Sequence, residues 1–358
     1  MKRRVIAAAV LAVALTGIVV HLAPGCTSFA VYSTRTLYGA NFDYPPSAIR
    51  FSIEDHDTGA VFLGAFRNGP TYASTTGLNE QGLFSANQMV YPERAVVAQR
   101  ASDELYFWEA FDGGVRECAS ADEVLDWIGE RQLVQAPSPQ LHNLYADPDG
   151  NAFVLECNAS QNVISPIDGD FLVMTNFHVG DFVGQPLDEI AGTGADRYRI
   201  AHDYISENLD AFDIDLAFDV LCRAAMKTGT FTTRYSLVVD PEALEIYLAL
   251  EHDFDHIWRV SLSDRTISTY RGFDEEHVLP LGRAGITGTQ LERYADSVTS
   301  MKEEGAVAES AAAEAPEEAV AAAASVESEP ERESSRWPIL AIVAAMLLGL
   351  GVLVLLRD

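Results

Sequence analysis

The chain has 358 residues, of which 24 are Lys or Arg and 53 are Asp or Glu, giving a formal net charge of -29. A surface this acidic repels polyphosphate, which argues against a nucleic-acid partner. With 48% hydrophobic and 9% aromatic residues the chain can build a packed core, so wholesale disorder is excluded. Four cysteines without a Cys-x-x-Cys pair argue against a disulfide scaffold and against a structural zinc site.

The first 25 residues have the plan of a secretory signal peptide. Residues 2–4 are basic, 5–20 form an apolar run, and 23–25 are small residues or proline directly before Cys26. This pattern predicts cleavage that makes Cys26 the new N-terminus. Two alternatives remain open. One is an uncleaved N-terminal anchor. The other is a lipoprotein with a lipidated Cys26, although Ala23 stands where that motif prefers a large aliphatic residue.

Cys26 is the candidate nucleophile. A thiol reacts as its thiolate, and an N-terminal cysteine carries a base in its own residue, because an α-amino group titrates near about pH 8. Cleavage before Cys26 would therefore both export the protein and activate it. The alternative is a buried cysteine that packs as a small hydrophobe, which is the usual role of a lone cysteine.

Strand-like segments dominate the chain from residue 26 to about residue 300. The first two, 27–33 and 37–42, predict an N-terminal hairpin. Further predicted strands cover 50–53, 61–66, 82–90, 141–146, 152–157, 171–175, 235–239, 245–250, 257–262 and 266–270, with Asp-Pro turns at 147–150 and 240–242. Helices are predicted around 103–111, after the capping box at 120–123, and at 195–208 and 216–226. Helices that arrive in clusters among mainly antiparallel strands indicate a single α+β domain over residues 26–300.

The end of the chain is predicted to be a stalk and a membrane anchor. Residues 301–335 contain ten Glu, two basic residues and no aromatic residue, which predicts an extended, self-repelling stalk. Within 336–358, the uncharged stretch 339–356 would span about 27 Å as a helix, enough to cross a bilayer. Export followed by this stop segment predicts a membrane-anchored protein whose folded domain is extracytoplasmic.

Five motifs occur in order between residues 26 and 250. They are Cys26-Thr27-Ser28-Phe29 followed by Asn41-Phe42-Asp43-Tyr44, the segment 76–83 with Asn79-Glu80-Gln81-Gly82-Leu83, Val173-Met174-Thr175-Asn176, Asp196-Arg197-Tyr198, and the late segment 233–250. Together they resemble the choloylglycine hydrolase and penicillin V acylase family of N-terminal-nucleophile amidases. The resemblance implies a four-layer αββα sandwich of two antiparallel sheets. It also implies hydrolysis of a linear, non-peptide amide bond in a small N-acyl substrate, with no cofactor.

The resemblance further implies roles for five side chains. Cys26 would attack the carbonyl, Asp43 would orient the Cys26 amine, and Asn176 would donate an N–H to the oxyanion. Arg197 would lie near the nucleophile. Asn87 is the chemically sensible second oxyanion donor, but a shift of one residue would turn it to the other face of its strand. The ordinary structural alternatives are a turn Asp, a strand-end Asn and a surface Arg.

Two other functions remain open. The Arg that the family carries before its Asn-x-Asp motif is Ala40 here, so a membrane-anchored binding protein without catalysis remains an alternative. An acyltransferase of the same fold, similar to acyl-CoA:6-aminopenicillanic acid acyltransferase, is another. The cluster at 252–256 holds two His and two Asp, but its spacing is not that of two ligands on one helix face, so no metal site is expected.

Overall fold

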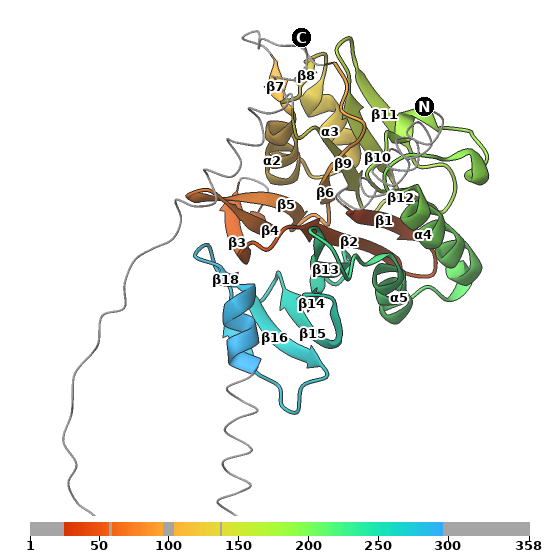
Figure 1. Cartoon of the computed structure of the whole chain (residues 1–358). Helices are drawn as coiled ribbons and strands as arrows, with labels where there is room; N and C mark the ends of the chain where they lie inside the picture. The colour runs from red at the N-terminus through yellow and green to blue at the C-terminus, as the bar shows by residue number, and fades with distance from the viewer. Residues whose placement is uncertain (1–24, 57–58, 96–103, 137, 296–358) are drawn as a thin grey trace, which may run out of the picture. The chain divides into compact units, whose positions relative to one another are not determined.

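The computed structural model describes residues 25–56, 59–95, 104–136 and 138–295 (Figure 1). The predicted signal peptide up to residue 24, the stalk (301–335) and the anchor (336–358) lie outside the described residues. Within the described ranges no helix is long and apolar enough to cross a membrane. The opening hairpin forms as predicted: β1 (Thr27–Tyr32) pairs with β2 (Thr36–Tyr44).

The first sheet has eight antiparallel strands in the order β12-β1-β2-β13-β14-β15-β16-β17. Beyond the hairpin these are β12 (Phe171–Met174), β13 (Thr232–Asp240), β14 (Glu245–Leu250), β15 (Asp253–Ser261), β16 (Thr266–Arg271) and β17 (Val278–Pro280). Strands from much later in the chain thus flank the hairpin, β12 against β1 and β13 against β2. Because neighbouring strands are antiparallel, four strand ends lie side by side at one end of the sheet: the start of β1, the ends of β2 and β12, and the start of β13.

The second sheet also has eight strands, in the order β11-β10-β9-β6-β5-β4-β3-β18. They are β3 (Ile49–His56), β4 (Gly59–Asn68), β5 (Thr71–Asn79), β6 (Phe84–Met89), β9 (Leu141–Ala146), β10 (Ala152–Cys157), β11 (Asn162–Pro166) and β18 (Ile286–Thr287). The sequence does not predict β5 or β11, because much of each strand is polar and partly exposed, so the apolar alternation typical of a strand is missing. Two short strands, β7 (Leu105–Tyr106) and β8 (Leu133–Val134), pair in parallel.

Four layers result from the alternation of side chains along the strands. Inner-face residues of both sheets, such as Tyr38, Phe84 and Tyr235, share one apolar core. A second core joins the outer face of the first sheet to α4 (Ala195–Asn208) and α5 (Ile214–Ala224). A third joins the outer face of the second sheet to α2 (Phe107–Glu117) and α3 (Ala121–Ile128). Figure 1 shows these two helices beside β6 and β9. The predicted αββα sandwich of two antiparallel sheets is therefore confirmed.

Short helical segments complete the described chain. Three 3-10 turns cover Val179–Asp181 (η2), Leu187–Glu189 (η3) and Leu209–Ala211 (η4), and a further helix begins at residue 288. The bounds predicted for α4 agree with the structure, and Ser120 caps α3 by accepting the N–H of Glu123. The helix predicted over 103–111 instead runs to Glu117 through two glycines. A Cβ at Gly113 would lie 2.3 Å from Trp127, so close packing of α2 against α3 requires a residue that usually signals a helix end.

Candidate active site

Cys26 lies directly before β1, so the first strand of the first sheet fixes its backbone. Its side chain is buried among residues of both sheets, and the N–H of Asp43 donates to its sulfur at 3.4 Å. In this chain, where Cys26 is still joined to Gly25, burial and then the charge of Asp43 raise the pKa of the thiol to about 12, although Arg197 acts in the opposite direction. The thiol is therefore protonated at neutral pH and needs a nearby base to react.

Asp43 lies near the end of β2, opposite Thr233 at the start of β13. Its buried carboxyl has two different oxygens: Oδ1 accepts the Thr233 hydroxyl at 2.6 Å, whereas Oδ2 has no hydrogen-bond partner in the structure. A Cβ placed at Gly25 would lie 2.8 Å from Oδ2, so this oxygen faces the peptide that precedes Cys26. Burial raises the pKa of Asp43 to about 7, despite the lowering effects of Arg197 and of the Thr233 hydrogen bond.

Arg197, in the first turn of α4, reaches the same segment. Its Nη1 donates to the carbonyl oxygens of Gly25 and Cys26 and, at 3.1 Å, to the hydroxyl of Thr27. Its Nη2 donates to Oδ1 of Asn176 at 2.9 Å. The guanidinium is buried, and burial lowers its pKa while the charges of Asp43 and Cys26 raise it. One cation thus holds both the segment that leads into β1 and Asn176, two residues after the end of β12.

Asn176 follows β12 and is fully buried. Because Arg197 donates to one atom of the Asn176 side-chain amide, that atom is the oxygen Oδ1 and the other is the nitrogen Nδ2. Nδ2 donates to the carbonyl of Met89 at 2.7 Å. The backbone carbonyl of Asn176 accepts the N–H of Tyr91, also at 2.7 Å. A primary amide has two N–H hydrogens, and Met89 takes one of them. The predicted role of this residue as an oxyanion donor depends on the second.

Asn87 does not join this group. Along β6, Phe84 and Ala86 pack into the core between the sheets, so Gln88 shares that inner face while Asn87 points to the outer face. Nε2 of Gln88 donates to the hydroxyl of Ser28, which lies two residues after Cys26 on the same face. Oδ1 of Asn87 has no hydrogen-bond partner in the structure. The structure therefore brings four of the five predicted side chains together, and the β6 side chain that reaches the start of β1 is that of Gln88.

No protein-family profile and no curated protein matches this sequence. Solved structures do match it. A Cys-to-Ala mutant of conjugated bile acid hydrolase from Clostridium perfringens has a TM-score of 0.53 and 15% identity, covering 69% of this chain and 96% of that one. An Arg-to-Leu variant of the same hydrolase gives 0.52 and 16%, with 69% and 97% covered. Penicillin V acylase from Agrobacterium tumefaciens gives 0.53 and 14%, with 68% and 90% covered. The chain has the fold of these enzymes.

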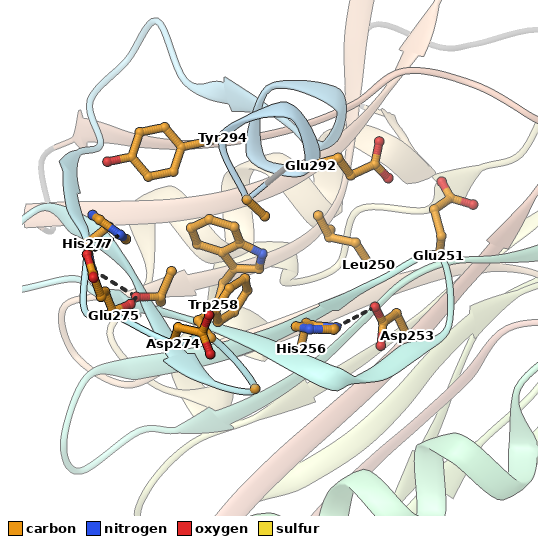
Figure 2. Close-up of a pocket in the computed structure, with 14 residues that line it drawn as sticks. Leu250, Glu251, Asp253, His256, Trp258, Asp274, Glu275, His277, Glu292 and Tyr294 are labelled. Atoms are coloured by element: carbon orange, nitrogen blue, oxygen red, sulfur yellow. Dashed lines mark hydrogen bonds and ion pairs between the residues drawn. The ribbon is translucent and has the colours of Figure 1, made fainter. Parts of the chain in front are cut away.

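A cavity of about 510 Å³ lies elsewhere, over β14 to β16 and the helix that begins at residue 288 (Figure 2). Aromatic side chains such as Trp258 and Tyr294 and several carboxylates line it, and Cys26 does not. His256, from the His/Asp cluster at 252–256, also lines it, with Nδ1 2.8 Å from Asp253. Among the residues that the structure describes, no three His, Cys, Asp or Glu side chains are arranged to hold a metal ion.

Three residues of the site received no role from the sequence. Thr233 holds Asp43 and also accepts the N–H of Met226 at 2.8 Å, which fixes its hydroxyl. Tyr91 binds the carbonyl of Asn176. Gly194 precedes α4 at φ +81°, and a Cβ there would lie 2.5 Å from the Arg197 guanidinium. Two of them could have been found from the sequence, because Thr233 is the first residue of the late motif and Gly194 directly precedes a predicted helix. No motif or pattern in the sequence points to Tyr91.

Proposed function

We propose that the chain is an N-terminal-cysteine amidohydrolase that becomes active when residues 1–25 are removed. The observation that carries this proposal is the unpartnered Oδ2 of Asp43, a buried carboxylate oxygen that faces the Gly25–Cys26 peptide. A buried polar atom without a partner is costly, and such atoms are rare in native proteins. Cleavage before Cys26 would place a free amine beside this oxygen and give it a hydrogen-bond donor.

The reaction follows from these positions. The Cys26 amine takes the thiol proton, and the thiolate attacks the carbonyl carbon of the substrate amide. The carbonyl oxygen becomes an oxyanion, to which the remaining N–H of Asn176 donates. When the C–N bond breaks, the ammonium returns its proton to the leaving amine, and a thioester remains on Cys26. Water then attacks the thioester carbon, and the released acid leaves a free thiol. Asp43 orients the amine throughout, and Arg197 holds the carbonyl of Cys26 and the amide oxygen of Asn176.

The proposed substrate is a small N-acyl amide. The similar structures are of a conjugated bile acid hydrolase and a penicillin V acylase, and both fit a site in which a thiolate meets an amide carbonyl. We also propose that the domain acts outside the cytoplasm, tethered through residues 339–356. Fractionation of cells with and without this segment tests the tether.

The test of the function is a hydrolysis screen on purified mature protein whose N-terminus is Cys26. A panel of N-acyl amides is incubated with the wild type, with Cys26→Ala, and with a form that keeps Gly25 joined to Cys26. The wild type alone should release amine, and intact-protein mass spectrometry should detect an acyl group on Cys26. Adding a second amine as acceptor separates a hydrolase from an acyltransferase by its products. Equal activity of Cys26→Ala, or a diacylglyceryl group on Cys26, would refute the proposal.

A further inference from the structure

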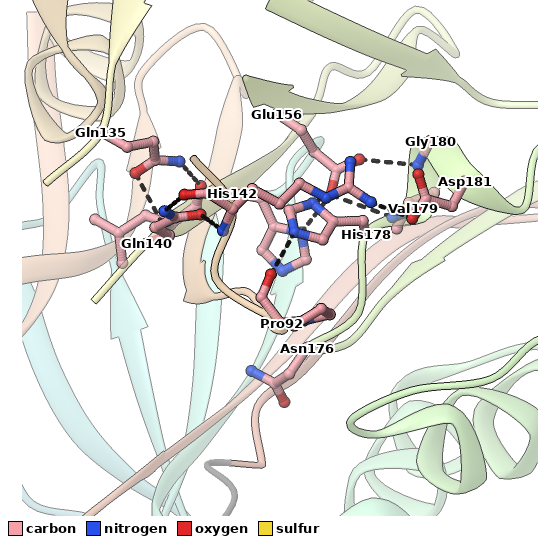
Figure 3. Close-up of polar contacts among 12 residues, drawn as sticks. Pro92, Gln135, Gln140, His142, Glu156, Asn176, His178, Val179, Gly180 and Asp181 are labelled. Carbon is pink, nitrogen blue, oxygen red and sulfur yellow. Dashed lines mark hydrogen bonds and ion pairs between the residues drawn. The ribbon is translucent and has the colours of Figure 1, made fainter. Parts of the chain in front are cut away.

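A buried array of four polar side chains lies at the inner face of the second sheet, and Figure 3 shows three of them, His142, Glu156 and His178. Gln88 of β6 lies opposite His142 of β9, and Nδ1 of His142 lies 3.3 Å from Oε1 of Glu156 on β10. Nδ1 of His178, two residues after Asn176, lies 3.3 Å from the same oxygen. All four side chains of the array are at most 4% exposed. A carboxylate buried this completely needs hydrogen-bond donors around it.

Glu156 has four such donors. Besides the two imidazole rings, the N–H of Val179 donates to Oε1 at 3.2 Å and the N–H of Gly180 donates to Oε2 at 2.8 Å. Burial alone would raise the pKa of Glu156, but the hydrogen bonds of His142 and His178 and the other donors outweigh it and lower the pKa to about 2. An ionised carboxylate only accepts hydrogen bonds, so Nδ1 of each ring is the donor to Glu156.

The carboxylate fixes the turn that follows the candidate oxyanion donor. Val179 and Gly180 begin η2, and a Cβ at Gly180 would lie 2.7 Å from Val163 and 3.2 Å from Oε2 of Glu156. Glycine at this position therefore lets the backbone approach the carboxylate closely. The chain from Asn176 to Gly180 is held at its far end by Glu156 and at its near end by Arg197.

The imidazole ring of His178 also connects this turn to the chain that follows β6. Nε2 of His178 lies 3.0 Å from the carbonyl oxygen of Pro92. The preceding residue, Tyr91, donates its N–H to the carbonyl of Asn176, and the carbonyl of Met89 accepts the side chain of Asn176. Residues 89–92 and 176–180 thus form one unit joined by these three polar contacts, and the second segment is also held by Arg197 and Glu156.

We propose that Glu156 is a positioning residue for Asn176: through His178 and the N–H groups of Val179 and Gly180 it holds the segment whose amide meets the oxyanion. This inference rests on the proposed function. Glu156 does not touch the substrate. It acts by setting where the Asn176 amide lies relative to Cys26, and a displacement of about 1 Å at a catalytic group can cost roughly 10²-fold in rate.

The kinetic test uses Glu156→Gln, which keeps the size of the side chain but replaces one acceptor by a donor. We expect kcat to fall about 10²-fold with KM nearly unchanged. Glu156→Asp keeps the charge and should recover part of the loss. The matched control is Asp147→Asn, because Asp147 is also a buried carboxylate that accepts backbone N–H groups, at the opposite end of the β9–β10 hairpin. Asp147→Asn should leave kcat close to wild type.

A double-mutant cycle separates positioning from general damage. If Glu156 acts through Asn176, then Glu156→Gln should have little further effect on kcat in an Asn176→Ala background. Losses that multiply in the double variant would overturn the proposal while leaving the amidase function intact. Wild-type kcat in Glu156→Gln would overturn it as well.

Hydrogen exchange gives a readout that needs no substrate. The N–H groups of Val179 and Gly180 lose their acceptor directly in Glu156→Gln, so the informative amide is that of Tyr91, which bonds only to Asn176 in this unit. It should exchange faster in Glu156→Gln and not in Asp147→Asn. If wild-type protein hydrolysed no N-acyl amide, the proposed function would fail, and faster exchange at Tyr91 would still support the positioning of Asn176. Unchanged exchange at Tyr91 would overturn it.

Discussion

The buried carboxyl of Asp43 predicts a pH-dependent weakness that only the unprocessed chain should have. Burial raises its folded-state pKa to about 7. In the unfolded chain an Asp ionises near about pH 4, so the folded state binds one more proton between these two values. The stability that comes from this proton is complete below about pH 4 and is lost as the pH rises through 7.

The size of the effect follows from the shift. A raise of about three pKa units corresponds to roughly 4 kcal/mol, since one unit is about 1.4 kcal/mol. A typical domain is stable by only about 5 to 15 kcal/mol. In the mature protein the amine of Cys26 would lie beside Oδ2 and favour the carboxylate, so the loss between pH 4 and pH 8 should be much smaller. Asn does not ionise, so Asp43→Asn should remove the difference in pH-dependent stability between the precursor and the mature protein.

Urea unfolding at pH 5 and pH 8 measures the part of this loss that falls above pH 5, which is about two pKa units or roughly 2.7 kcal/mol. The free energy of unfolding is compared for the precursor, in which Gly25 is joined to Cys26, and for the mature protein, each with and without Asp43→Asn. We expect the wild-type precursor to lose more stability between these pH values than the other three. The mature Asp43→Asn protein should also lose about tenfold to a hundredfold in kcat/KM, because a charged hydrogen bond of roughly 1.5 to 3 kcal/mol is gone. Equal pH dependence in all four proteins would refute the reasoning.

Four other outcomes are expected. Mature Cys26→Ser should fold and lose nearly all amidase activity, because a hydroxyl is far less acidic than a thiol; a substantial residual rate would move the chemistry elsewhere. Asn176→Ala should lower kcat about 10²- to 10³-fold with little change in KM, and Asn87→Ala, on the outer face, should cost less; a near wild-type rate in folded Asn176→Ala would remove it from the site. Gly194→Ala should lower the melting temperature and kcat together, since φ +81° and the guanidinium contact both disfavour a Cβ; unchanged values would show that the guanidinium can shift freely. Deleting 339–358 should release an active soluble enzyme, and an inactive product would show that the domain boundary is misplaced.

Local sequence patterns predicted many of the strands and helices, whereas the four-layer sandwich and the roles of Asp43, Asn176 and Arg197 were implied by the resemblance to a known family. The bounds of α4 follow from its sequence, and the turn at Asp147 follows from a carboxylate that accepts the N–H groups of Asp149 and Asn151. The order of the strands could not be derived locally. Asp43 meets Thr233 across two strands that are 190 residues apart, and no periodicity in either segment specifies that pairing.

The site also shows where one residue of register matters. Side chains alternate along β6, so the same motif match places either Asn87 or Gln88 on the face of Cys26, and only the pairing with β5 and β9 decides between them. The array around Glu156 was not predicted for a related reason. His142 and Glu156 are 14 residues apart on neighbouring predicted strands, but His178 follows a strand of the other sheet, and each alone is typical of an ordinary exposed polar residue.

The buried position of Gly25 and Cys26 sets an order of events for the proposed maturation. Both residues are buried, and the carbonyl oxygens of both accept hydrogen bonds from Arg197. A peptidase requires an accessible, extended stretch of chain on both sides of the bond it cuts. On the proposed route the cut would therefore come while the chain is still unfolded, before α4 and the two sheets enclose the junction. A chain that folded first would bury the Gly25–Cys26 peptide bond before it could be cut. It would then remain a stable but inactive precursor.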